Sequence, residues 1–198
     1  MSQPYFETVK SFADVPIVED GVETVAFLEA SDGLVSMFDL FGSAIFGFVQ
    51  DDLRSNISGV RGRYTSTGES STTLEKLVIV ESKEQHRHAT GCLVRLMRGL
   101  AFTCQALQNA LNDRRSELHV CFKRSYDVTL RQHHSFIIRS VVTVAIRHVP
   151  RRPDFFNRIA QGGSHEKLDE ELQKWLAGLD TIVKHMKNFL EQGGHGRV

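Results

Sequence analysis

The sequence predicts an all-α protein folded as a single domain of about eight helices. Apolar residues recur at helical spacing in several long segments, most clearly in residues 168–190. Only four of the 198 residues are proline, and three of these lie in or beside apparent breaks. With 41% hydrophobic residues the chain can bury one sizeable core, and no linker divides it convincingly. We therefore expect one domain over 1–198, with its core in about 6–190.

Four helices are predicted in the first half of the chain. Gly33 and its polar neighbours are expected to separate the first two helices, because glycine favours breaks. The acidic pair Asp51 and Asp52 suits the positive end of a third helix. Thr72 and Glu75 match a capping box that would begin the fourth. The expected bounds are 22–30, 34–40, about 51–63 and 73–84.

Three longer helices are predicted in the second half. A long amphipathic segment is followed by a Val- and Ile-rich segment whose length favours helix over strand. Pro150 and Pro153 are expected to break that second helix, and the glycine-rich tail after residue 192 is expected to fray. The expected bounds are 88–112, from 118 through 126–146, and 168–190.

Composition and motifs exclude several classes of function. The 24 basic and 24 acidic residues cancel, which argues against nucleic acid as the main partner. The first residues do not predict a secretory signal, and no apolar run is long enough for a membrane span. The histidine pairs lack metal-ligand spacing, and no nucleophile elbow or phosphate-binding loop occurs. We therefore expect neither metal nor cofactor nor catalysis, and the three unpaired cysteines suit a reducing compartment such as the cytosol.

Polar residues within apolar helices are the candidate site residues. Arg95 and Arg98 share a helical face beside an apolar stripe, so they need either water or an anionic partner. Asp52 and Asn56 lie one turn apart at the edge of another stripe and together offer hydrogen-bond donors and acceptors. Taken singly, each has a structural explanation: snorkelling arginines, a helix-dipole carboxylate with a surface amide, and, for His134, a histidine of the core boundary.

In combination, these residues and their neighbours resemble the glycolipid transfer protein superfamily. The resemblance is carried by Asp52-X-X-X-Asn56, by the segments 95–107 and 130–138, and by Leu172-Gln-Lys-Trp-Leu-Ala-Gly-Leu179. It extends from about residue 6 to residue 190 and is closest to the fungal heterokaryon-incompatibility branch, the HET-C-like proteins. It implies a two-layer helical sandwich that binds one sphingolipid, with the headgroup at the surface and the chains in an apolar pocket.

The resemblance also implies roles for individual residues. Asp52 would accept hydrogen bonds from the ceramide amide or a sugar, Asn56 would contact the sugar, and His134 would donate to the acyl carbonyl. Arg95 occupies the place of the tryptophan on which glycolipid-selective members stack the first sugar. With Arg98, it would meet an anionic or hydroxylated headgroup, although a structural salt bridge is an equal alternative for Arg98.

The remaining positions of the headgroup site combine features of the glycolipid-selective and the ceramide-1-phosphate-selective members. Arg95 is typical of members that select ceramide-1-phosphate, and a guanidinium suits a phosphate because its planar donors pair with two oxygens. Those members carry a lysine where this chain has Asn56. Gly59 replaces a lysine of the glycolipid-selective members, and Arg63, on the same helical face, is expected to supply the missing charge.

The sequence thus predicts a monomeric, cytosolic sphingolipid transfer protein that touches membranes transiently. Its headgroup would be either a simple glycolipid or ceramide-1-phosphate. A sphingolipid sensor acting through a protein partner would have the same pocket. A helical scaffold without ligand, and a hydrolase using His134, are the structural and enzymatic alternatives.

Overall fold

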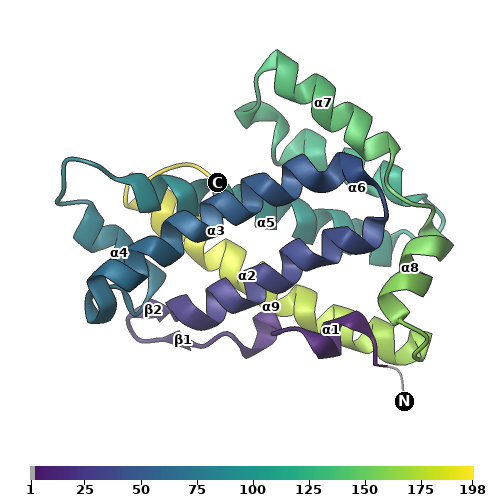
Figure 1. Cartoon of the computed structure of the whole chain (residues 1–198), viewed down its shortest axis with the longest axis horizontal. Coiled ribbons are helices and arrows are strands. Elements are labelled where there is room, and N and C mark those ends of the chain that lie inside the picture. The colour runs from purple at the N-terminus through teal and green to yellow at the C-terminus, as the bar shows by residue number, and fades with distance from the viewer. Residues whose placement is uncertain (1–2) are drawn as a thin grey trace.

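The structure is a computed structural model that describes residues 3–198, and it is almost entirely helical (Figure 1). Its nine α-helices in this range are α1 (Tyr5–Thr8), α2 (Thr24–Met37), α3 (Gly47–Thr67), α4 (Leu74–Glu81), α5 (His88–Asn112), α6 (Leu118–Val128), α7 (Phe136–Arg147), α8 (Arg152–Ala160) and α9 (His165–Gln192). Short 3-10 helices connect them: η1 (Phe12–Asp14), η2 (Phe38–Phe41), η3 (Ala44–Phe46), η4 (Gly68–Ser71) and η5 (Arg131–His133). One antiparallel ribbon, β1 (Ile17–Val18) with β2 (Gly21–Val22), pairs Ile17 with Val22. The predicted all-α class is confirmed.

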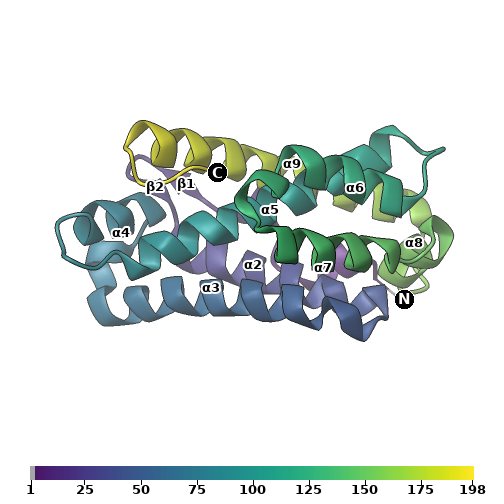
Figure 2. The same cartoon turned by 90° about the horizontal axis from the view of Figure 1, so that it is seen from above.

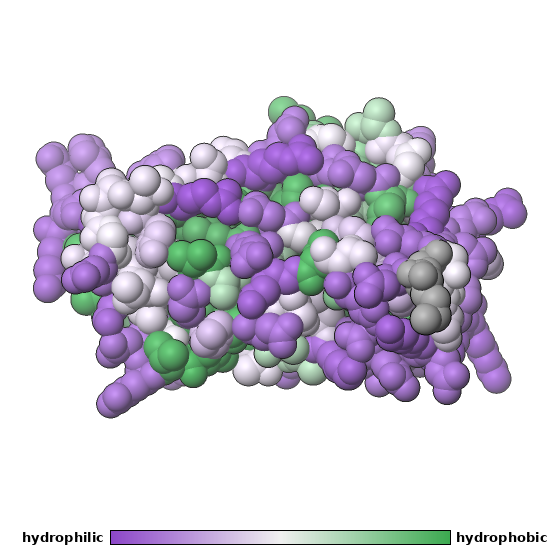
Figure 3. All heavy atoms as spheres, turned by 60° about the horizontal axis from the view of Figure 1, so that its bottom comes forward, coloured by the Kyte–Doolittle hydropathy of each residue, from purple (hydrophilic) through white to green (hydrophobic). Residues whose placement is uncertain are grey.

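Helix α5 forms the centre of the molecule and packs against α3, α6 and α9. Figure 2 shows α2 and α3 along one side and α6 and α9 along the other, which is the expected two-layer arrangement. Trp175 of α9 is 1% exposed, and its ring centroid lies 5.1 Å from those of Phe6 and Phe12. The face in Figure 3 is mostly hydrophilic, with separate hydrophobic patches. No helix in residues 3–198 is both long and apolar enough to cross a bilayer.

The first half of the chain differs from the prediction at Gly33. Instead of separating two helices, this glycine lies within the single helix α2. A Cβ atom at Gly33 would lie 2.9 Å from the Cβ of Val9, and the Tyr5 hydroxyl donates to the Gly33 carbonyl at 2.6 Å. The glycine is therefore explained by close packing of the N-terminal segment on α2 and not by a break.

The predicted capping box is also wrong. Thr73, not Thr72, caps α4, because its hydroxyl accepts a hydrogen bond from the Lys76 N–H. The Glu75 carboxylate accepts from the Val22 N–H at 2.8 Å and contacts the His185 ring nitrogen at 2.6 Å. Glu75 thereby connects the β-ribbon, α4 and α9.

In the second half of the chain, one predicted helix has the observed bounds and another is interrupted. Helix α5 has the predicted bounds, whereas the long helix expected from residue 118 to residue 146 is interrupted between Val128 and Phe136. The interruption contains η5 and ends at Ser135, whose hydroxyl accepts from the Ile138 N–H and caps α7. Pro150 lies in a break as predicted, but Pro153 belongs to the first turn of α8, where its missing N–H costs nothing.

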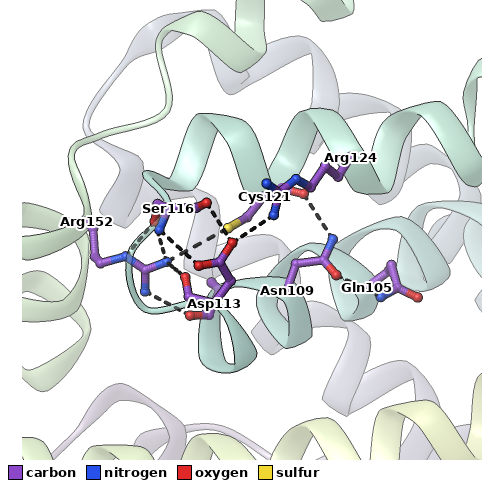
Figure 4. Close-up of polar contacts among 8 residues, drawn as sticks. Gln105, Asn109, Asp113, Ser116, Cys121, Arg124 and Arg152 are labelled. Carbon is purple, nitrogen blue, oxygen red and sulfur yellow. Dashed lines mark hydrogen bonds and ion pairs between the residues drawn. The ribbon is translucent and has the colours of Figure 1, made fainter.

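Arg152 secures the end of the molecule at which α5, α6 and α8 meet (Figure 4). Its guanidinium donates to the carbonyls of Ala110, Asp113 and Ser116 at 2.6 to 2.9 Å. The Ala110 carbonyl lies in the last turn of α5 and has no partner within the helix, whereas the Asp113 and Ser116 carbonyls belong to the turn that follows. These bonds hold the turn that positions α6.

The tail is not frayed but folds back over α9 and α5. The His195 N–H donates to the Leu190 carbonyl at 2.8 Å, and the His195 ring stacks on Phe189 at 5.6 Å. Val198 is 8% exposed, and its N–H donates to Glu191 Oε1 at 3.1 Å. This return brings the Arg197 carbonyl to Arg98 of α5.

Candidate functional site

A cavity of about 450 Å³ opens between α3, α5, η5 and α7. Four of the five predicted site residues line it, namely Asp52, Arg95, Arg98 and His134. They come from three separate segments of the sequence, so only the tertiary fold brings them together. The apolar lining residues are Phe38, Phe48, Val49, Leu53, Phe102, Leu130, Ile138, Val141 and Val142. The cavity thus joins a polar cluster to an apolar space, which is the usual composition of a ligand site.

Asn56 lies behind the cavity wall and connects two of the lining residues. It is 3% exposed, and its Oδ1 accepts from Arg95 Nε at 2.9 Å. Its Nδ2 donates to the Asp52 carbonyl at 2.8 Å and to Asp52 Oδ2 at 3.3 Å. Asn56 therefore orients the Asp52 carboxylate and the Arg95 guanidinium, while its direct contact with a headgroup stays a prediction.

Arg95 is exposed, and its guanidinium is held at two points. Besides the bond from Nε to Asn56, its Nη2 donates to Cys92 Sγ at 3.4 Å. No acidic side chain in residues 3–198 forms an ion pair with it. Its position is therefore fixed while its charge remains uncompensated by the protein.

Arg98 is half-buried and is held by the main chain of the tail. Its Nε donates to the Arg197 carbonyl at 2.8 Å. Arg98 is therefore held by a main-chain carbonyl and not by the structural salt bridge that was the alternative. Burial lowers the pKa of Arg98, and the positive charge of Arg95 lowers it further. An anion between the two arginines would relieve this repulsion.

His134 lies at the end of η5, and its ring is positioned by α6. The buried hydroxyl of Tyr126 is 3.1 Å from His134 Nδ1. Burial lowers the pKa of His134, an effect that Asp52 opposes and that Arg139 and Arg98 reinforce. The ring is therefore neutral at neutral pH. When Tyr126 donates to Nδ1, the single proton of the neutral ring is on Nε2.

Arg63 does not supply the charge expected from it. Its guanidinium is occupied by the Glu84 carboxylate, with Nη1 and Nη2 at 3.0 and 2.5 Å from the two oxygens, and it does not line the cavity. Gly59 is packed against α5, because a Cβ atom there would lie 2.4 Å from Cys92 Sγ. The two arginines of the cavity, Arg95 and Arg98, carry its permanent positive charge, and both belong to α5.

His133 is a cavity residue that the sequence reasoning missed. In the sequence it stands out only as part of a histidine pair, and residues 3–198 contain no cluster of three metal-ligating side chains. The structure places its ring in the cavity wall beside Arg98, because η5 turns both histidines of the pair inward. The sequence does not indicate which Val and Ile residues of α7 line the cavity, and the structure places Ile138, Val141 and Val142 there.

Comparisons with known proteins place the chain in a family. The family model described as glycolipid transfer protein matches residues 22–161. A glycolipid transfer protein of Aureobasidium melanogenum is 38% identical over 187 residues, which are 94% of this chain and 92% of that protein. An all-helical fold around a mainly apolar cavity with a polar end suits a lipid ligand. The family match and this relative show that the chain belongs to the glycolipid transfer protein family.

Solved structures agree with this assignment. The fungal glycolipid transfer protein HET-C2 is 39% identical, with a TM-score of 0.89 over 94% of this chain and 96% of that one. A structure concerning how FAPP2 selects simple glycosphingolipids is 28% identical, with a TM-score of 0.88 over 98% and 97%. The human ceramide-1-phosphate transfer protein, solved with 12:0 ceramide-1-phosphate, is 18% identical with a TM-score of 0.84 over 97% of both chains, a likeness of fold.

Proposed function

We propose that this protein transfers one sphingolipid at a time between membranes. The observation that supports this most directly is the cavity, in which Asp52, His134, Arg95 and Arg98 lie beside an apolar lining. A lipid has the same two-part chemistry, with a polar headgroup and amide followed by hydrocarbon. The family to which the chain belongs is one of transfer proteins, and the proposed activity includes no covalent step.

The ceramide amide is the proposed anchor of the lipid. An amide removed from water needs one acceptor for its N–H and one donor for its carbonyl, and each group left unpaired costs about 1–3 kcal/mol. Asp52 supplies the acceptor, and Asn56 holds its carboxylate in place. The neutral His134 supplies the donor through Nε2 when Tyr126 donates to Nδ1.

An anionic headgroup suits the polar end of the cavity better than a simple neutral sugar. Arg95 and Arg98 bring two charges, and the only acidic residue in the lining is Asp52. The stacking face that the family uses for a first sugar is replaced at Arg95 by a guanidinium, which pairs with phosphate oxygens. Ceramide-1-phosphate is the proposed ligand, and a monohexosylceramide is the alternative.

Helix α7 is proposed to form both a movable wall of the lipid pocket and the membrane contact. Only three of its twelve residues are buried, namely Val142, Ala145 and Ile146. Phe136 is 82% exposed and Ile137 is 73% exposed. Residues 118–160 hold eight Lys and Arg against two Asp, although the whole chain is neutral, so this apolar surface lies within a basic region. Such a surface suits a membrane that contains anionic lipid.

Vesicle-to-vesicle transfer of labelled ceramide-1-phosphate tests the proposal. The unmodified protein should accelerate transfer, and Asp52→Val should reduce it by at least tenfold, because the lipid amide would lose its acceptor. Asp51→Val, which changes the neighbouring exposed carboxylate outside the cavity lining, is the matched control. Tight binding without transfer would favour a sensor, and Asp52→Val with unchanged binding and transfer would refute the site.

A further inference from the structure

His133 contains a buried polar atom that no part of the described chain satisfies. Its Nε2 is buried and has no hydrogen-bonding partner within residues 3–198, yet its ring lines the lipid cavity. Leaving such an atom unpaired destabilises a protein, and most buried polar atoms in native structures have a partner. Because the ring lines the cavity, a ligand that fills the cavity contacts it.

The surroundings of His133 are positively charged. Arg98 of α5 lines the same cavity, and because its Nε is bonded to the tail, its two terminal nitrogens are left for a ligand. Lys187 of α9 is bonded to the Val198 carbonyl at 2.6 Å, and His134 follows in sequence. On η5 and α6, Arg131 and Asp127 pair with each other at 3.2 Å. Lys187 also pairs with Glu191 at 3.7 Å, and Asp52 is the acidic residue that lines the same cavity. Arg98 itself is bonded to a main-chain carbonyl and forms no ion pair with a carboxylate in residues 3–198.

This arrangement determines the charge of the ring in the protein without lipid. Burial lowers the pKa of His133, and Arg98, His134 and Lys187 lower it further. The ring is therefore neutral at neutral pH, and protonation would add a charge beside Arg98. An anionic oxygen bound between the ring and the guanidinium would reverse this balance by favouring the protonated ring.

We propose that His133 and Arg98 form a second contact for an anionic lipid headgroup, and that His133 takes up a proton when this headgroup binds. The inference rests on the proposed lipid-binding function and adds a residue and a proton to it. Arg95 would approach the headgroup from the Asn56 side, and the Arg98–His133 pair from the tail side. A neutral sugar would only hydrogen bond to the ring and would take up no proton.

The affinity for an anionic lipid depends on pH because lipid binding and protonation of His133 are coupled. The pKa of His133 is low in the free protein and higher in the complex, so between these two values binding includes proton uptake. In that range the affinity for the anionic lipid rises as pH falls, by up to about tenfold for each pH unit. Binding of a neutral glycolipid lacks this contribution.

Proton NMR of the His133 ring tests the inference in the intact protein. The ring is titrated without lipid, with galactosylceramide and with ceramide-1-phosphate, and His133→Gln identifies its signal. We expect ceramide-1-phosphate to raise the pKa of His133 by about one unit or more. Galactosylceramide should leave it within a few tenths of a unit. An unchanged pKa with bound ceramide-1-phosphate would overturn the inference.

Affinity measurements separate this outcome from a failure of the proposed function. A phosphate monoester itself titrates near pH 6, at about the same pH as histidine, so the comparison is made with variants. His133→Gln should lose the histidine part of the pH dependence, whereas His148→Gln, an exposed histidine bonded to its own helix, should keep it. Transfer of glycolipid without any binding of ceramide-1-phosphate would overturn the inference alone. No transfer of either lipid would refute the proposed function.

Discussion

Replacing Arg95 by tryptophan should shift the headgroup preference from phosphate towards sugar. The change removes a guanidinium that is fixed by Asn56 at 2.9 Å and by Cys92 at 3.4 Å, and it adds a flat aromatic face at the same place. A lost charge-assisted hydrogen bond to a phosphate costs about 1.5–3 kcal/mol. A gained contact between an aromatic face and a sugar contributes about 0.5–1.5 kcal/mol.

These magnitudes predict the size of the effect. Together they change the preference by about 2 kcal/mol or more, which is a factor of about 30 or more. The variant should also be less stable by about 1–3 kcal/mol, because the buried Oδ1 of Asn56 loses its donor. Arg95→Lys should retain part of the phosphate preference without gaining the sugar, since it keeps the charge but not the planar donors.

A competition transfer assay measures this preference directly. Donor vesicles carry glucosylceramide or galactosylceramide together with ceramide-1-phosphate, and the transfer of each lipid is followed. Arg54→Trp, at an exposed position of α3 outside the cavity lining, controls for a new surface tryptophan. Efficient transfer of monohexosylceramide by the unmodified protein, with an unchanged ratio in Arg95→Trp, would refute the reasoning.

Two further variants test the membrane surface and the core. Phe136→Ser should slow transfer several-fold while changing the free energy of unfolding by less than about 0.5 kcal/mol, because its side chain is 82% exposed. Ile79→Ser on α4 is the control in the same vesicle assay, and equal rates for both would contradict a contact through α7. Gly178→Ala should destabilise the protein by about 1–3 kcal/mol in thermal unfolding, since its Cβ would lie 2.2 Å from a backbone nitrogen of η1. Gly62→Ala, which meets nothing within 4 Å, should instead stabilise α3, and similar melting temperatures would contradict this packing.

Local signals in the sequence predicted helices well where periodicity and boundaries agreed. The bounds of α5 were correct because its apolar stripe is long and continuous. Gly33 misled because a glycine required for close packing looks the same in the sequence as a glycine that breaks a helix. The interruption before α7 was missed because it contains neither glycine nor proline.

The candidate site could be predicted only in part, for a physical reason. Asp52, Arg95 and Arg98 are conspicuous as polar residues within apolar helices, and the resemblance to a family pattern assigned roles to them and to His134. The structure places all four around one cavity. The role of His133 depends on how η5 turns, which no periodicity encodes. The partner of Arg98 was equally hidden, because a main-chain carbonyl carries no signal in the sequence.

The different partners of the two arginines explain why the pocket combines features of two selectivity classes. Arg95 is held by the side chain of Asn56, so a lysine at position 56 would remove its acceptor and place a second cation beside it. An arginine at position 95 is therefore compatible with the asparagine of this chain without any compensating acidic residue. Arg98 is held by a main-chain carbonyl, which substitution at position 56 leaves in place. We therefore expect headgroup preference to depend on the pair formed by residues 56 and 95, and Arg98 to contribute the same positive charge whichever residue stands at position 56.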